Sequence, residues 1–197
     1  MPRKRLIRTS QFYYHVRTRS NHKEWFQLPL DQVWRIICAS ADKAIERHKG
    51  IISQLVLMNN HYHLLVRTPQ MNIDQFMYEF NKTFSDRLRK ESGQVNRMFG
   101  SSYKWSIISN QNYYLNVYRY IYQNPLRAGV VTNCEDYPYS SLWFESRKQE
   151  LQFKFTPLFD FSDEILEFLN RPIDQDNILR IRKGLIKTRF KEVFARK

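Results

Sequence analysis

The sequence predicts an α+β fold: a ferredoxin-like sandwich in which helices cover an antiparallel sheet. Strand-like and helix-like segments follow in the order β-α-β-β-α-β, two strands flank a two-residue turn, and both intervening helices carry an apolar stripe. The predicted strands span residues 12–19, 51–58, 61–68 and 103–109, and the two helices span residues 30–49 and 72–91.

The first half of the pattern begins with FYYHVRTR, whose aromatic and β-branched residues favour an extended chain. A helix opens at Leu30-Asp31, with Asp31 as a plausible cap, and Gly50 is expected to stop it. Its apolar positions recur at helical spacing: Val33, Ile36, Ile37, Ala41, Ala44 and Ile45.

The second half begins with IISQLVLM and HYHLLVRT, two strands joined at Asn59-Asn60, a residue pair that tolerates left-handed backbone. The second helix follows, ends before Gly93, and has one apolar stripe: Ile73, Phe76, Met77, Phe80, Phe84 and Leu88. The segment YKWSIIS is the fourth strand.

The pattern continues beyond the sandwich. An added helix is predicted from Gln111 to about Asn124, ended by Pro125 and free to lie near the other face of the sheet. DYPYSSLWF then predicts an irregular aromatic strap that packs back on the domain. Residues 163–170 and 176–197 look helical, and the last helix has an apolar stripe of Ile178, Ile181, Leu185, Ile186, Phe190 and Phe194.

We therefore divide the chain into a domain of residues 1–145 and a basic helical C-terminal extension of residues 146–197. The extension is either a DNA-binding arm or a docked helix with a solvated basic face.

The charge indicates a polyanionic partner. Lys and Arg number 32 against 19 acidic residues, for a formal net charge of +13. Twelve tyrosines and four tryptophans among these cations suit a single strand, whose bases stack on rings, although many of the rings belong to the core. No apolar run has the length of a membrane span and the basic start has no signal-peptide core, so we expect a soluble intracellular protein. Cys38 and Cys134 have no metal or redox spacing, which argues against a disulfide framework.

A pair of histidines is the first candidate site. His61 and His63 alternate on a predicted strand, so both imidazoles point away from the face of Tyr62, Leu64 and Val66. Two imidazoles on an open sheet face can hold a divalent metal, and the alternative is two surface histidines.

The added helix supplies the partner chemistry. Tyr120 and Asn124 lie one turn apart on the face that also carries Tyr113 and Asn116, and the neighbouring face is expected to belong to the core. A tyrosine hydroxyl can attack a phosphorus atom that a metal polarises. The Asn124 amide oxygen is a candidate third ligand for a hard ion such as Mg²⁺ or Mn²⁺; alternatively, Asn124 is an ordinary helix stop.

These segments resemble a known family. MNNHYHLLVRTP is similar to the His-hydrophobic-His strand of the single-tyrosine transposases, and YRYIYQNPLRAGVV is similar to their catalytic helix. YHVRTRSN and DYPYSSLW also match, and the chain most resembles the REP-associated tyrosine transposases of bacteria over roughly residues 1 to 145. The paired motif at this separation is highly specific.

The resemblance implies a ferredoxin-like fold, His61 and His63 as metal ligands and Tyr120 as nucleophile. It implies a single-stranded DNA hairpin as substrate, cleaved through a 5′-phosphotyrosine and a free 3′-hydroxyl without ATP. The chain has no nucleotide-binding loop, in agreement. Relatives act as dimers or monomers, so a monomer and a homodimer both stay open, and we expect a cytoplasmic location in a bacterium.

The chain departs from the family pattern at Asn59, where proline is usual, and at Ser102, where an arginine is usual. We expect the loss of that arginine's phosphate contact to weaken DNA binding without abolishing the chemistry. The residues expected to contact DNA are His15, Arg17, Arg19, Lys104, Arg119 and Arg127. Of these, His15, Arg17 and Arg19 lie on one face of the first strand and could compensate for the missing arginine. For the first-strand residues among them, the alternative is a solvated face.

Three other functions compete with a strand transferase. The main one is a catalytically silent module that binds single-stranded nucleic acid, because RNA-recognition sandwiches share the element order, although YKWSIIS fits their aromatic strand poorly. If the chain is instead a basic structural or partner-binding protein, we expect no strong salt-dependent affinity for DNA. A metal-dependent hydrolase is disfavoured because no acidic cluster has ligand spacing.

Overall fold

Four strands form one antiparallel sheet in the computed structural model, which describes residues 5–95 and 97–190. The strands are β1 (Tyr13–Arg19), β2 (Ile51–Met58), β3 (His61–Arg67) and β4 (Lys104–Ile108), in the order β2-β3-β1-β4. All three neighbouring pairs are antiparallel, and this order places the first and third strands at the centre. The predicted ferredoxin-like arrangement is therefore confirmed.

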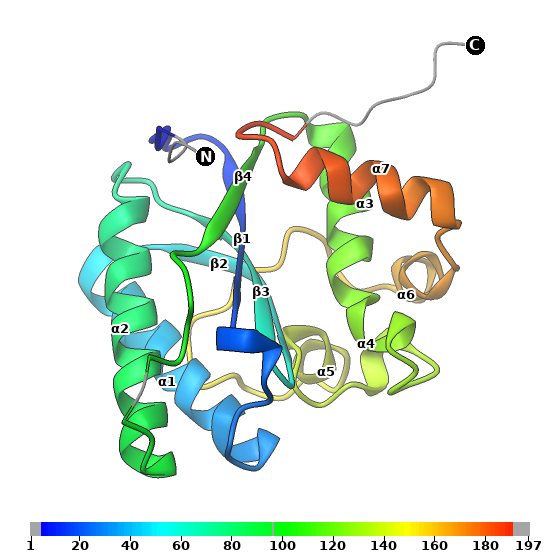
Figure 1. Ribbon diagram of the computed structural model, residues 1–197. Helices are drawn as coiled ribbons and strands as arrows, with labels where there is room; N and C mark the ends of the chain where they lie inside the picture. Colours follow the sequence, from blue (N-terminus) through cyan, green and yellow to red (C-terminus); the bar gives the residue numbers. More distant parts are fainter. Residues whose placement is uncertain (1–4, 96, 191–197) are drawn as a thin grey trace.

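Helices α1 (Leu30–His48) and α2 (Ile73–Ser92) cover one face of this sheet (Figure 1). We call it the helix face. Their apolar stripes meet every second residue of the strands because alternate residues of a strand point to the same side. The resulting core includes Tyr14, Val16, Tyr62, Leu64, Val66, Phe76, Phe80 and Phe84, all of them fully buried.

The opposite face, which we call the site face, packs against α3 (Gln111–Tyr122) and the C-terminal part of the chain. Shorter helices follow α3: α4 (Asn124–Arg127), α5 (Ser141–Ser146), α6 (Asp163–Asn170) and α7 (Gln175–Leu185). In Figure 1, α3, α6 and α7 lie across the sheet from α1 and α2. Leu65 and Ile108 of the sheet share a second core with Ile121, Leu169 and Ile181.

The C-terminal half also covers both edges of the sheet. Residues around Tyr139 lie along β2, where Leu57 N donates to Tyr139 O over 2.9 Å. At the other edge, Ile107 N of β4 donates to Thr188 O and Phe190 N donates to Ile107 O. Covering an edge removes unpaired backbone groups that otherwise pair with other chains.

Several element ends differ from the sequence expectations. Lys49, with φ of 53°, takes the left-handed position that ends α1, and Gly50 is needed for a different reason: a Cβ there would lie 2.3 Å from the Phe76 ring. Asp31 lies in the first turn of α1, but no side chain caps it. Neither Asn59 nor Asn60 adopts a positive φ. Gly93 ends α2 with φ of 69°, as expected.

The later segments differ as well. The added helix ends at Tyr122, and Asn124 begins the short helix α4, which contains Pro125 near its start. The aromatic strap packs back on the domain, but part of it is helical, as α5. The final helix ends at Leu185, and Phe194 of its expected stripe lies outside the described residues.

The helices of residues 5–95 and 97–190 include none with both the length and the apolar character needed to cross a membrane.

Candidate active site on the open sheet face

The two histidines of β3 lie side by side on the site face, as the strand alternation predicts. The ring centroids of His61 and His63 are 5.3 Å apart, whereas Tyr62 between them is buried under the helices. Antiparallel register pairs His61 with Arg19 and His63 with Arg17 on β1. The site is therefore built from two adjacent central strands and has a cation beside each imidazole.

Hydrogen bonds hold both imidazoles through the same ring nitrogen. His61 Nδ1 lies 2.7 Å from Asn60 Oδ1, and His63 Nδ1 lies 2.8 Å from His15 Nε2. His15 and His63 also stack, with centroids 5.1 Å apart. In the described part of the chain, no hydrogen bond occupies Nε2 of His61 or His63. A support at one ring nitrogen that leaves the other for a ligand is typical of metal-binding histidines.

Burial keeps these rings neutral at pH 7. It lowers the pKa of His15 to about 3 and that of His61 to about 4, and nearby arginines contribute in the same direction. The pKa of His63 lies well below its ordinary value, again first because of burial and then because of the neighbouring histidines. A neutral imidazole is the form that binds a metal ion.

Tyr120 of α3 lies over this pair. Its ring is 4% exposed, and its centroid is 6.4 Å from that of His63 in an edge-to-face arrangement. The Arg127 guanidinium lies over the Tyr120 ring, 4.4 Å from its centroid. The structure thus brings the expected nucleophile to the expected ligands.

Asn124 is close to this centre but is already engaged. Its amide nitrogen donates to Ile121 O over 2.8 Å, and its Oδ1 accepts from Arg127 over 3.0 Å. These bonds join the end of α3 to α4, which is the structural role that the alternative reading gave it. A ligand role for Asn124 stays a prediction, and its oxygen would be shared with Arg127.

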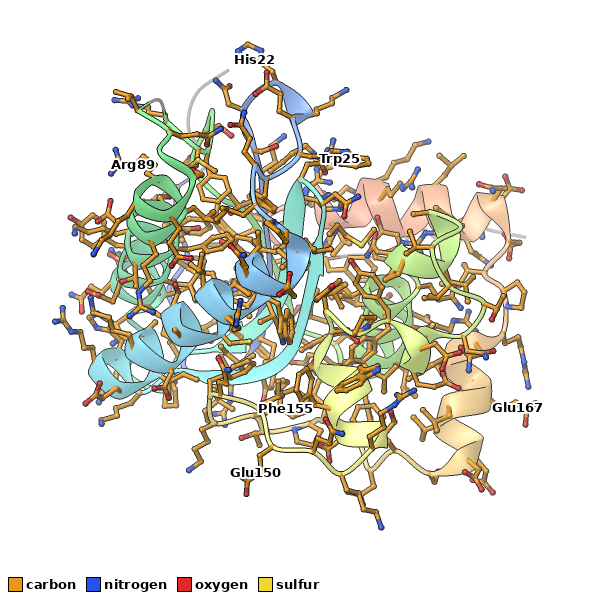
Figure 2. All side chains as sticks on the ribbon, turned by 90° about the horizontal axis from the view of Figure 1, so that it is seen from below. His22, Trp25, Arg89, Glu150, Phe155 and Glu167 are labelled. Carbon is orange, nitrogen blue, oxygen red and sulfur yellow. The ribbon has the colours of Figure 1, made fainter. Side chains whose placement is uncertain are left out.

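A basic groove of about 410 Å³ opens next to His61. Arg17, Arg19 and Lys104 line it together with Ser102, and none of its lining residues is acidic. The full lining is Arg17, Thr18, Arg19, Ser20, His22, Lys23, His61, Gly100, Ser101, Ser102 and Lys104. Figure 2 shows the loop of His22 and Trp25 at the opposite end of the molecule from Phe155. A single strand fits such a groove because phosphates meet cations along it.

Two expected DNA contacts have other surroundings. His15 is buried at 1% exposure against His63, so in this position it supports that ring instead of meeting a phosphate. Arg119 lies over the Phe168 ring of α6, 4.5 Å from its centroid, and is not among the residues that line the basic groove. Both differences arise from packing partners distant in sequence.

Arg182 of α7 was not among the predicted site residues. Its positive charge lowers the pKa of both Arg17 and Arg127, for which burial is the larger cause. The spacing of Arg182 from Ile178 and Ile181 in the apolar stripe was a signal for its orientation. No sequence pattern indicated that this apolar stripe packs against α3.

The residues present fit a divalent ion. Two neutral imidazoles offer Nε2 from one side of the sheet, and an amide oxygen lies at the end of α3. Within residues 5–95 and 97–190, no three His, Cys, Asp or Glu side chains form a group able to hold a metal ion by themselves. Further ligands would therefore come from Asn124 or the substrate.

The fold and the site define a class: an α+β sandwich with a histidine pair on a central strand and a helical tyrosine above it. Residues 8–124 match the family model "Transposase IS200 like". This match covers more than half of the chain, and the chain therefore belongs to the IS200-like transposase family.

The chain is similar to solved structures, and the first one reported below shares its fold. A REP-associated tyrosine transposase bound to a REP hairpin is 19% identical with a TM-score of 0.62, over 82% of this chain and 96% of the other. A candidate transposase from Deinococcus radiodurans R1 is 15% identical with a TM-score of 0.41, over 61% of this chain and 94% of the other. No curated protein matches the sequence.

Proposed function

We propose that the protein is a metal-dependent strand transferase that cuts and rejoins single-stranded DNA through Tyr120. The observation that carries this proposal is the edge-to-face contact between Tyr120 and His63, centroids 6.4 Å apart. A structural tyrosine has no need of a supported pair of neutral histidines beside it. Family membership makes DNA cleavage the activity to expect.

In the proposed step, the Tyr120 hydroxyl oxygen attacks the phosphorus of a phosphodiester. The new bond joins Tyr120 Oη to phosphorus, and the bond that breaks joins phosphorus to the 3′ oxygen. The proton lost by the phenol is balanced by the one that the leaving 3′ oxygen gains, as free 3′-hydroxyl. Reversal at a second end rejoins DNA without ATP because the phosphotyrosine keeps the bond energy.

His61 and His63 would hold the divalent ion, Mg²⁺ or Mn²⁺, with Asn124 as the proposed third ligand. When bound, the ion polarises the phosphate and stabilises the charge that develops on it. His15 and Asn60 fix the two imidazoles through their Nδ1 atoms, which sets the direction of each Nε2.

The proposed substrate is a DNA hairpin with a single-stranded flank, held in the basic groove by Arg17, Arg19 and Lys104. A protein of the same fold was solved with a REP hairpin. We further propose that residues 1–145 form the transposase domain and residues 146–197 an extension of it, in a cytoplasmic bacterial protein that acts as a monomer or a homodimer.

A second function is favoured by one observation: Tyr120 is 4% exposed beneath Arg127, and therefore covered in the free protein. A catalytically silent module that binds single-stranded nucleic acid would tolerate this. The transferase requires the substrate phosphate to reach the hydroxyl of this mostly buried side chain.

The test incubates the full chain with labelled single-stranded hairpin DNA and Mn²⁺ and resolves products on a denaturing gel. We expect a protein-DNA adduct that chelator abolishes and that Tyr120→Phe lowers by more than about a thousandfold, because the nucleophile is gone. Tyr114→Phe is the matched control on the same helix and should form the adduct normally. Hairpin binding without an adduct in any metal would favour the silent module.

A further inference from the structure

Two arginines lie beside Tyr120, and a third, the exposed Arg182 of α7, is an electrostatic neighbour of both. Arg127 lies 4.4 Å over the Tyr120 ring, and Arg17 comes from β1, where it pairs with His63. The Tyr120 phenol is an electrostatic neighbour of both guanidinium groups, and Arg182 of α7 is a neighbour of both as well.

These arginines have no acidic partner. In the part of the chain that the structure describes, no salt bridge involves Arg17, Arg127 or Arg182. Burial is the main reason that the pKa values of the partly buried Arg17 and Arg127 are lowered, and repulsion from Arg182 lowers both further. Partly buried like charges cost free energy unless an anion lies among them.

One donor group also points to a missing acceptor. Arg127 uses Nη2 to donate to Tyr120 O and to Asn124 Oδ1, whereas its Nη1 is buried without a hydrogen-bond partner among the described residues. A buried guanidinium N–H that makes no hydrogen bond costs free energy. A site that contains such a donor is therefore suited to bind an incoming oxygen ligand.

The position of Arg182 depends on α7. Ile178, Ile181 and Leu185 of this helix are buried in the same core as Tyr120, and α7 packs against α3. The match to the family model ends at residue 124, before both Arg127 and Arg182. The C-terminal helix therefore brings a cation to a centre whose histidines and tyrosine come from the matched part.

We propose that Arg17, Arg127 and Arg182 form a phosphate clamp that holds the phosphodiester attacked by Tyr120, with Arg182 supplied by the C-terminal helix. This inference rests on the proposed function for the identity of the phosphate. The clamp binds the two non-bridging oxygens. Negative charge grows on these oxygens as the bond from Tyr120 Oη forms and the bond to the 3′ oxygen breaks, so the three cations favour the transition state over the bound substrate.

The test compares Arg182→Ala with Arg180→Ala in the full chain. Arg180 is on the same helix, and its charge acts on Asp174 at the start of that helix. The two variants lose the same charge from different faces. Adduct formation is measured at saturating hairpin DNA with Mn²⁺, and affinity is measured separately by fluorescence anisotropy.

We expect Arg182→Ala to lower the rate at saturating DNA by about a hundredfold, the effect of removing one donor to a developing oxyanion, and to change affinity by less than about threefold. Arg182→Lys should restore part of the rate because it keeps the charge but loses the fork of donors. Arg180→Ala should keep the wild-type rate. Equal rates for Arg182→Ala and Arg180→Ala would overturn the clamp.

A second readout does not depend on the chemistry. Inorganic phosphate, compared with chloride at equal ionic strength, should raise the Tm of the wild type and of Arg180→Ala more than that of Arg182→Ala. If no protein forms an adduct but this difference holds, the anion site stands and the transferase fails. If Arg182→Ala forms the adduct at the wild-type rate and shows the full phosphate effect, the clamp fails and the transferase stands.

Discussion

The same strands serve different purposes on the two faces of the sheet. On the helix face of β3, Tyr62, Leu64 and Val66 are fully buried, and the Tyr62 hydroxyl is satisfied by Thr18 and Asn81. On the site face of the same strand, His61 and His63 lie among uncompensated arginines. Alternation lets one strand carry a satisfied core on one side and a costly polar cluster on the other. Stability and function are therefore separable by substitution.

The largest expected effect on stability lies in the helix face. Phe80 is fully buried and contacts Tyr62, Phe76 and Phe84, with ring centroids 5.4 to 6.4 Å apart. Phe80→Ala should lower the free energy of unfolding by about 3–5 kcal/mol, because it removes apolar contact and leaves a cavity. Urea denaturation measures this loss. The folded fraction should keep its adduct-forming activity.

The matched change on the site face is His61→Gln. It should change the free energy of unfolding by less than about 1 kcal/mol, because His61 is only half-buried, but it should remove the metal-dependent adduct. The division between the faces would be broken by a Phe80→Ala protein that stays as stable as the wild type, or by a His61→Gln protein that unfolds.

The second expected effect is a difference between the two faces in the pH range over which stability is lost. The folded pKa values of His15 and His61, about 3 and about 4, lie below the ordinary value of 6.5. The unfolded chain therefore takes up protons first, and stability is full above pH 6.5 and falls as the pH drops toward 4. Between pH 7.5 and 5.5 we expect a loss of about 1 kcal/mol for each of His15 and His61. Urea denaturation in the presence of chelator measures it.

On the helix face, acid lowers the free energy of unfolding in a lower pH range. Glu79 accepts from Lys43 and Arg47, each at 2.9 Å, and the hydrogen bond from Lys43 is the main reason that its pKa lies below the ordinary 4.5. Its contribution is present above that value and is lost as the pH falls below it. Glu79→Gln should therefore leave the change between pH 7.5 and 5.5 intact. A stability that is flat over that range would contradict the burial of the histidines.

The periodicity of apolar residues explains how much of the fold could be predicted from the sequence. A period of two in HYHLLVRT and of 3.6 in residues 72–91 reports local geometry, and both elements formed where predicted. The ends were less accessible because they depend on partners. Gly50 looked like a helix stop, but it is required by the Phe76 ring of α2, and Lys49 takes the strained conformation instead.

The site divides in the same way. His61, His63 and Tyr120 were accessible because a strand and a helix each fix the direction of their own side chains. Contacts between elements could not be predicted in this way. Examples are the burial of His15 against His63, the stacking of Arg119 on Phe168, and the approach of Arg182 to Arg127. To predict them, one has to know which faces of the helices and of the sheet pack together. Long-range packing sets these contacts, and no local pattern encodes it.

The smallest expected effect concerns the rim of the site face. Lys104 is exposed at the start of β4, pairs with Arg17 and lines the basic groove. Lys104→Gln should weaken hairpin binding about equally for all sequences, and the slope of log affinity against log salt should become shallower by about 0.7, the value for one phosphate contact to a single strand. Fluorescence anisotropy at several salt concentrations measures the slope.

Lys154→Gln is the control for this change. Lys154 is exposed next to Phe155, at the far end of the molecule from His22 of the groove (Figure 2). It removes the same charge from the whole protein, so a general electrostatic attraction predicts the same small change for both variants. A local phosphate contact predicts a shallower slope for Lys104→Gln alone. Equal slopes would move DNA binding away from the groove and leave the site face with its catalytic centre but without a proposed path for the strand.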